Sequence, residues 1–167
     1  GADDVTIDSL LFRNGDTGIL STTSSDSDRL TISRSRFERL FRGIDVRPGN
    51  DGWIVSGSRF SNPDGPAFSL GVFASTAARI ESSEFTGISI GLDLSGGALA
   101  VGNDVHDNTT YGIRLAAGGR AEGNRIYGHD ATDFQNALEM SGGEAVGNEI
   151  FGNAIGARPT SGLLVGN

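Results

Sequence analysis

Apolar residues recur along this chain in a fixed order that does not follow the 3.6-residue period of an amphipathic helix. Most repeats begin with an aliphatic residue, have a small polar residue three positions later and a large apolar residue two positions after that, and close with a glycine–aliphatic pair. The second repeat shows the order in full with Ile32, Ser35, Phe37 and Gly43-Ile44. Within each short segment alternate positions are apolar, which predicts β-strands with one face turned inward.

Seven such repeats follow one another, and an eighth begins at Leu164. The large apolar positions are separated by 25, 23, 25, 20, 21 and 24 residues and are Phe12, Phe37, Phe60, Phe85, Val105, Ile126 and Ile150. The small polar residue is serine in the second to fourth repeats and asparagine in the fifth to seventh, at Ser35, Ser58, Ser83, Asn103, Asn124 and Asn148. The closing apolar positions are predicted at Ile19, Ile44, Phe68 with Leu70, Leu92, Ile113, Leu138 and Ala157. A self-similar period of this length is typical of a solenoid.

The repeat predicts an all-β solenoid of about seven coils. One coil cannot bury its own apolar face, so the coils must stack, about 4.8 Å apart, with like residues over like. The interior is then expected to hold a phenylalanine stack, an aliphatic stack and a Ser/Asn ladder whose side chains hydrogen-bond from coil to coil.

Two short motifs carry a resemblance to a known fold. Gly123-Asn124-Arg125-Ile126 and Gly112-Ile113-Arg114-Leu115 resemble the repeats of right-handed parallel β-helix proteins, a superfamily that includes pectate lyases, polygalacturonases, alginate epimerases and periplasmic copper-maturation proteins. The resemblance covers nearly the whole chain and implies one right-handed, single-stranded parallel β-helix domain over residues 1–167, which we expect to be part of a larger bacterial protein. The motifs describe core packing, so they are specific for the fold and not for an activity. The Asp-Pro-His motif of the alginate epimerases does not occur in this chain.

Composition narrows the classes of function. The formal net charge is -8 with a pI of about 4.6, which disfavours nucleic acid as a partner. All 13 basic residues are arginine, so lysine Schiff-base chemistry is excluded, and the absence of cysteine excludes disulfides and thiolate metal sites. No apolar run reaches the ~18 residues of a membrane span.

The outward residues of the closing strands are expected to form one exposed column, 45, 69, 93, 114, 139 and 158. In it Asp93, Arg114 and Glu139 would make an acid–base–acid line, and we assign these three to substrate binding. Cross-strand charge pairing on a solvated sheet is the alternative. Inverting glycoside hydrolysis is disfavoured, because Arg114 between the two carboxylates would keep both ionised.

The two histidines form a second candidate site. His106-Asp107 and His129-Asp130 are expected at comparable places in adjacent coils. Histidine carries protons near neutral pH, and a following aspartate can orient it. A uronate lyase or epimerase would use His106 or His129 as base, with Arg114 neutralising the substrate carboxylate. Tyr111, which ends the first of these loops, is assigned to substrate binding. The alternative is that polar solenoid turns simply favour His, Asp and Asn.

Metal binding and anion binding are two further possibilities. Oxygen ligands for calcium could come from Asp104, Asp107, Asp130 and Asp133, but no EF-hand or nonapeptide calcium motif is present. We therefore predict no cofactor and leave calcium open. A group of arginines in the second coil predicts either a solvated face or a contact with an anionic glycan, and consists of Arg34, Arg36, Arg39, Arg42 and Arg47.

Taken together, these features predict a polysaccharide-contacting β-helix module of a secreted or surface protein, with the periplasm as another location. Binding or scaffolding is favoured over catalysis, and whether the chain is an enzyme is left open, with uronate lyase or epimerase chemistry as the alternative. A third possibility is a structural spacer or adhesin segment that associates end to end, because stacked strands leave open edges unless they are capped.

Overall fold

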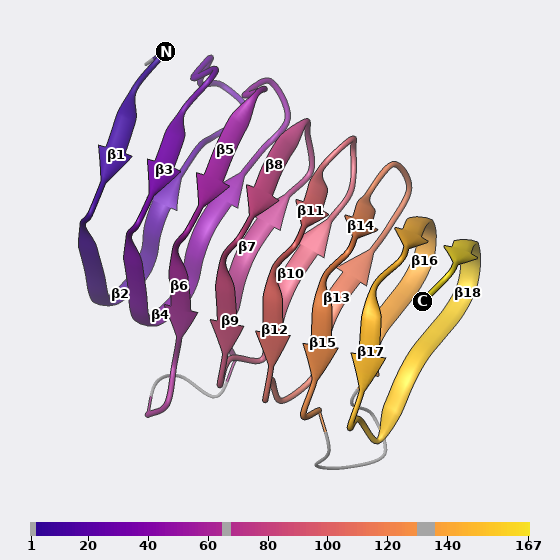
Figure 1. Cartoon of the computed structure of the whole chain (residues 1–167). Coiled ribbons are helices and arrows are strands. Elements are labelled where there is room, and N and C mark those ends of the chain that lie inside the picture. The colour runs from indigo at the N-terminus through magenta and orange to yellow at the C-terminus, as the bar shows by residue number, and fades with distance from the viewer. Residues whose placement is uncertain (1–2, 65–67, 130–135) are drawn as a thin grey trace.

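The computed structural model describes residues 3–64, 68–129 and 136–167. These residues form eighteen β-strands and no helix, and the strands join in one continuous parallel sheet that winds into a solenoid. The described residues therefore include no helix able to cross a membrane. The all-β parallel β-helix of about seven coils predicted from the sequence is confirmed. Its coils stack in chain order, with the N- and C-terminal residues at opposite ends (Figure 1).

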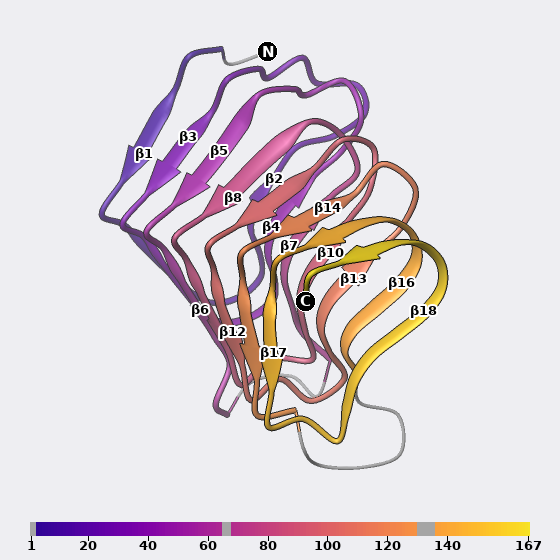
Figure 2. The ribbon, with the colours of Figure 1, turned by 45° about the vertical axis from the view of Figure 1, so that its right-hand side comes forward.

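Each coil contributes to three faces, which surround a common core (Figures 1 and 2). Face 1 is made of β1 (Thr6–Asp8), β3 (Thr31–Ser33), β5 (Trp53–Ser56), β8 (Ala78–Glu81), β11 (Leu99–Val101), β14 (Arg120–Glu122) and the C-terminal parts of β16 (Asn136–Val146) and β18 (Ile155–Val165). Face 2 is made of the N-terminal parts of β2 (Leu11–Leu20) and β4 (Arg36–Val46), followed by β6 (Arg59–Ser61), β9 (Glu84–Thr86), β12 (Asp104–His106), β15 (Arg125–Tyr127) and β17 (Glu149–Phe151). Face 3 is made of the C-terminal parts of β2 and β4, then β7 (Leu70–Ala74), β10 (Ile90–Leu94), β13 (Tyr111–Leu115) and the N-terminal parts of β16 and β18.

The phenylalanine stack lies inside face 2, as predicted. Phe37 pairs in register with Phe60, and Phe60 with Phe85. Successive ring centroids are 4.5 and 4.6 Å apart, with planes within 6° of parallel. These three side chains are almost fully buried, so each contributes the burial of a large apolar surface, about 1.5–3 kcal/mol per side chain.

A polar ladder occupies the corner between faces 1 and 2. The Oδ1 atom of Asn124 accepts the backbone N–H of Asn103 at 2.9 Å, and its Nδ2 donates to the carbonyl of Ala100 at 3.1 Å. In the serine coils Ser58 Oγ accepts the N–H of Ser35 at 3.1 Å in the same way. The ladder thus satisfies backbone groups that the turn removes from the sheet pairing.

The residue before each ladder position explains the Gly-Asn dipeptides. The chain turns this corner in the left-handed conformation, for example at Gly123 with φ of 59°. Glycine adopts this conformation without steric cost, whereas other residues do not.

One part of the predicted core is wrong. Phe68 is 48% exposed, and the closing pair of the third coil is Gly71-Val72, with Val72 in register with Ile44. The segment between Phe60 and Val72 holds about five more residues than the segment between Phe37 and Ile44. Counting the usual spacing from Phe60 therefore gives a closing position that is too early in the chain. A Cβ on Gly71 would lie 2.5 Å from the carbonyl oxygen of the next coil, which is why glycine stands there.

Candidate functional site

The predicted column on face 3 exists, with one member replaced. Register places Phe73, not Ser69, beside Asp45 and Asp93. Ser69 precedes β7 and is 2% exposed, so its assignment to the outward column is wrong. The cause is the same shift in the third coil that moved the closing pair from Phe68 to Val72.

The charges in this column satisfy one another. Arg114 Nε donates to Asp93 Oδ1 at 3.0 Å, and a second guanidinium nitrogen contacts Asp93 Oδ2. This hydrogen bonding raises the pKa of Arg114 above its ordinary value. Glu139 is in register with Arg114 but accepts a hydrogen bond from Asn136 Nδ2 at 2.6 Å. Tyr111 lies beside them, with the Arg114 guanidinium 6.0 Å from its ring centroid.

The column is less exposed than expected. Asp93 is 8% exposed, and Asp45 is fully buried between Arg42 at 2.9 Å and Arg47 at 2.6 Å. Buried carboxylates are stable only when paired in this way. The expectation of an open acid–base–acid surface is therefore wrong for the aspartates, and the column resembles an internal ion-pair network more than a binding groove.

The two histidines do not occupy comparable positions. His106 belongs to β12 and points outward from face 2, where its partner in register is Tyr127. His129 lies after β15 at the corner between faces 2 and 3 and has no exposed surface. One imidazole points outward and the other is enclosed in the core, so the expectation of comparable positions is wrong.

His129 takes the place of an asparagine in a second polar ladder. Its backbone N–H donates to Asn153 Oδ1, and its Nδ1 lies 3.0 Å from the same oxygen. On the other side Asn108 Nδ2 lies 3.4 Å from His129 Nε2. Burial away from water lowers the pKa of His129, so its imidazole is held in the neutral form inside the core.

His106 is held by carboxylates and by ring stacking. Its Nδ1 lies 2.7 Å from Asp107 Oδ2 and its Nε2 lies 3.3 Å from Glu84 Oε1. The imidazole stacks on the Tyr127 ring at 5.0 Å, and Tyr127 stacks on Phe151 at the same distance. Both ring nitrogens therefore face side chains of the protein, and the ring faces along this column cover one another.

The candidate oxygen ligands for calcium are only partly covered by the described residues. Asp130 and Asp133 lie outside the described residues. Within the ranges that the structure describes, no three His, Asp or Glu side chains converge to hold a metal ion. Asp104 instead lies 3.7 Å from Arg125, and Asp107 contacts His106. Calcium binding stays an open alternative.

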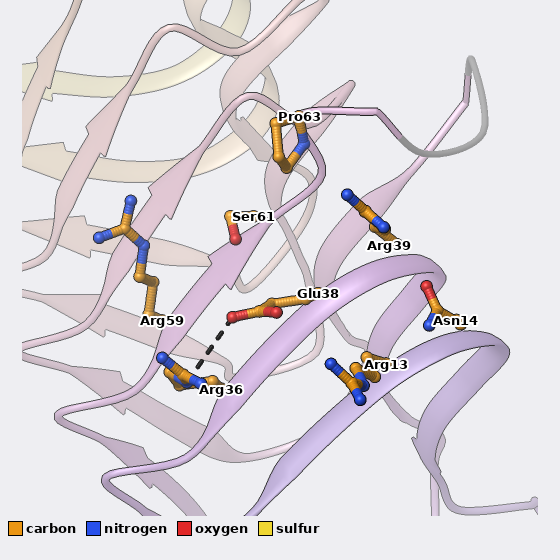
Figure 3. Close-up of a pocket in the computed structure, with 8 residues that line it drawn as sticks. All are labelled: Arg13, Asn14, Arg36, Glu38, Arg39, Arg59, Ser61 and Pro63. Carbon is orange, nitrogen blue, oxygen red and sulfur yellow. Dashed lines mark ion pairs between the residues drawn. The ribbon is translucent and has the colours of Figure 1, made fainter.

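An arginine-lined hollow, which we call the arginine cavity, lies on face 2 (Figure 3). Its volume is about 370 Å³, and its walls come from coils one to three. The lining residues are Arg13, Asn14, Arg36, Glu38, Arg39, Arg59, Ser61 and Pro63. Glu38 lies in the middle of this group, with the arginines around it and Arg36 at 3.6 Å (Figure 3).

A second hollow adjoins the arginine cavity and shares Arg59 with it. We call it the serine hollow; its volume is about 330 Å³. It follows the corner of faces 1 and 2 across coils three to five and is lined by Gly57, Ser58, Arg59, Ser82, Ser83, Glu84, Gly102 and Asp104. The two hollows together cross five consecutive coils.

Sequence reasoning found only part of the arginine cavity. Arg36 and Arg39 were in the predicted arginine group, but Arg13 and Arg59 belong to neighbouring coils and were missed. The signal was available in the repeat, because Arg59 stands one period after Arg36 and is in register with it. The other members of the predicted group point elsewhere, and each contacts an aspartate: Arg34 contacts Asp8, while Arg42 and Arg47 contact Asp45.

Comparison with known proteins bears on the fold and not on this site. No curated protein and no solved structure matched the chain. The coil order, the parallel register and the stacked core agree with one protein family, described as the right-handed β-helix region, which residues 1–163 match. The chain therefore belongs to the right-handed β-helix family.

Proposed function

We propose that this chain is a polysaccharide-contacting β-helix module that binds its ligand and does not cleave it. The observation that carries the proposal is that the arginine cavity and the serine hollow are neighbours, with Arg59 lining both. Each has a volume near the lower end of the range for small-ligand sites. An extended ligand that fills both would lie across five coils of face 2 and its corner.

The chemistry of the two hollows favours a hydroxyl-rich polymer. Their side chains are arginine, glutamate, aspartate, serine and asparagine, with Pro63 as the main apolar contact. Such groups bind by directed hydrogen bonds and ion pairs rather than by burial of apolar surface. Secretion or display at the cell surface, with the periplasm as the alternative, is the location that we propose for a protein with this ligand.

Binding is favoured over catalysis by the state of the predicted catalytic groups. His129 is enclosed in the core, and Arg114 is engaged with Asp93. His106 is the accessible candidate base, yet its nitrogens face Asp107 and Glu84. A uronate lyase or epimerase would need one of these groups to be free for substrate.

The proposal is tested by binding of fluorescently labelled oligosaccharides of increasing length, measured by anisotropy. We expect affinity to rise with length until both hollows are filled, and Arg59→Gln to weaken binding of the long oligomers most. Arg120→Gln on face 1 removes the same charge away from the hollows and is the control. Affinity that is independent of length, or equally affected by both variants, would contradict the proposal.

Catalysis is tested on the same polymers. We expect no unsaturated product by ultraviolet absorbance from alginate, pectate or related polyuronates, with or without calcium, and no epimerisation by proton NMR. Turnover that His106→Gln abolishes would replace the binding proposal by a lyase or epimerase.

A second candidate function, self-assembly, is favoured by the apolar ends. Coil one exposes Leu10 at 51% and the last coil exposes Leu164 at 42%, each at a position that is buried in the neighbouring coil. Among the described residues, β18 pairs with β16 alone, so its other edge is open. Open parallel edges flanked by leucine favour stacking of a further coil, whether from the same polypeptide or from a second copy.

A further inference from the structure

We infer that the arginine cavity is a subsite for an acidic sugar residue, carboxylated or sulfated, within the polysaccharide of the proposed function on which this inference rests. The two acid groups share the chemistry that the cavity recognises, a compact anion with several acceptor oxygens. The proposed function does not specify whether the polysaccharide is charged. This inference specifies that it is acidic and that its acid group binds in the arginine cavity.

The cavity concentrates positive charge in an acidic protein. Its lining holds four arginines and one glutamate, a formal charge of +3, whereas the whole chain carries -8. Clefts lined by one sign of charge raise the local concentration of oppositely charged ligands. Every cation is an arginine, whose planar fork matches the oxygens of carboxylate and sulfate in a bidentate manner.

The guanidinium groups of the cavity are only partly used by the protein. Arg13 forms no ion pair with any residue in the described ranges. The other three have long contacts: Arg36 to Glu38 at 3.6 Å, Arg39 to Asp64 at 3.3 Å and Arg59 to Glu84 at 3.3 Å.

Several arginines elsewhere in the chain are held more tightly. Arg29 lies 2.7 Å from Asp4, Arg47 lies 2.6 Å from Asp45, and Arg120 lies 2.7 Å from Glu144. Charge-assisted hydrogen bonds normally have lengths near these shorter values. The arginines of the cavity are at least half exposed where paired, so they retain donors that an anion can use.

Arg39 also turns a corner of the solenoid in the left-handed conformation. Its φ is 55°, at the place between faces 2 and 3 that Gly87 and Gly152 occupy in two other coils and that Asn14 and Asp107 occupy in two more. A long side chain is rarely found in this left-handed conformation, and residues that bear such strain gather at binding sites. The side chain that carries this cost lines the cavity.

Glu38 gives the cavity its selectivity. Its carboxylate lies among the arginines and is in register with Arg13 on the neighbouring coil. An acidic sugar can compete with this internal carboxylate for guanidinium donors, whereas a neutral hydroxyl is a much weaker competitor. Removal of the Glu38 charge should therefore strengthen the binding of an acidic ligand, and removal of the Arg13 charge should weaken it.

The test measures anisotropy of labelled oligomers of polygalacturonate, dextran sulfate and unmodified dextran at low ionic strength. We expect Arg13→Gln to weaken binding of at least one acidic oligomer about tenfold and Glu38→Gln to tighten it several-fold. Neither variant should change binding of dextran. Arg158→Gln is the matched control, because Arg158 is also exposed and without an ion pair in the described ranges but lies on β18.

The outcomes separate this inference from the proposed function. Preference for polygalacturonate or for dextran sulfate identifies the acid group. Equal binding of dextran and of both acidic oligomers, unchanged in Arg13→Gln, overturns the acidic subsite but leaves the polysaccharide module standing. Binding of none of the three overturns both. Tighter binding of a single-stranded RNA than of either acidic oligomer also overturns the inference, as does an equal effect of Arg158→Gln. Thermal unfolding matched to wild type shows that each variant is folded.

Discussion

His129 stands in a ladder that its neighbouring coils build from asparagine. Asn108 and Asn153 accept backbone N–H groups through their side-chain oxygens, and the imidazole between them is completely buried. An asparagine is neutral at every pH, whereas a histidine takes up a proton when it is exposed to acid. One residue of the core thus couples folding to pH in a way that the rest of the ladder does not.

We predict that His129 makes the protein less stable in mild acid. Burial lowers its pKa in the folded state, so between that pKa and the unfolded value of about 6.5 the unfolded chain binds the extra proton. The free energy of unfolding is therefore highest above pH 6.5 and falls as the pH drops through this window. Urea unfolding from pH 8 to 5 measures it, and His129→Asn should flatten the dependence. An unchanged slope in His129→Asn would show that groups other than His129 are responsible.

A second prediction concerns the stability that the fold loses by having Arg39, a residue of the arginine cavity, in the left-handed conformation. Arg39→Gly should stabilise the fold by about 0.5–1 kcal/mol, because relief of the left-handed conformation exceeds the added chain entropy. The same change should weaken binding of an acidic oligomer. Arg13→Gly is the control, since Arg13 lies in strand β2 without a positive φ and glycine should destabilise it there. Urea unfolding and anisotropy give the two readouts, and a destabilised Arg39→Gly would refute the idea that Arg39 is strained.

At the scale of elements, the strands were predictable because the residue pattern that specifies each strand lies within a few neighbouring positions. The spacing from Ile32 to Phe37 fits within one coil and repeats with little change, so stacking and ladder followed from counting. The corners were not predictable in the same way. His129 follows His106 by 23 residues where the repeat is 21, and these two extra positions carry it around a corner and into the core. The arginine cavity depends on side chains from three coils meeting at such a corner, which no single repeat encodes.

Close approach of the strands on face 3 gives the third prediction. A Cβ on Gly91 would lie 2.5 Å from the Gly112 carbonyl oxygen and 3.0 Å from the Val105 side chain. Gly91→Ala must therefore push two coils apart, and we expect a loss of about 1–3 kcal/mol in the free energy of unfolding. Gly15→Ala is the control, because its nearest contact would be 3.5 Å to a flexible Leu40 side chain. A Gly91→Ala protein as stable as wild type would mean that the coils can separate at little cost.

At the scale of the whole molecule, each coil contacts only the coils beside it, so the two terminal coils each lack one neighbour among the described residues. Leu164 shows the consequence. It is in register with buried Ala145 and faces inward, yet it remains 42% exposed because nothing stacks on it. The surface around Leu164 on one end and the surface around Leu10 on the other are unlike patches that can meet head to tail.

We predict that the 167-residue chain associates end to end, with a mass that rises with concentration in sedimentation velocity. Leu164→Asp should shift the distribution toward monomer, because a carboxylate would be buried without a partner in the contact. Ile54→Asp is the matched control, since Ile54 is 37% exposed on the side of the solenoid in β5, away from both ends. A monomer at every concentration would remove self-assembly as a function of this chain. An equal loss of mass in Ile54→Asp would place the contact on a lateral face instead, where it would compete with polysaccharide for the surface of the coils.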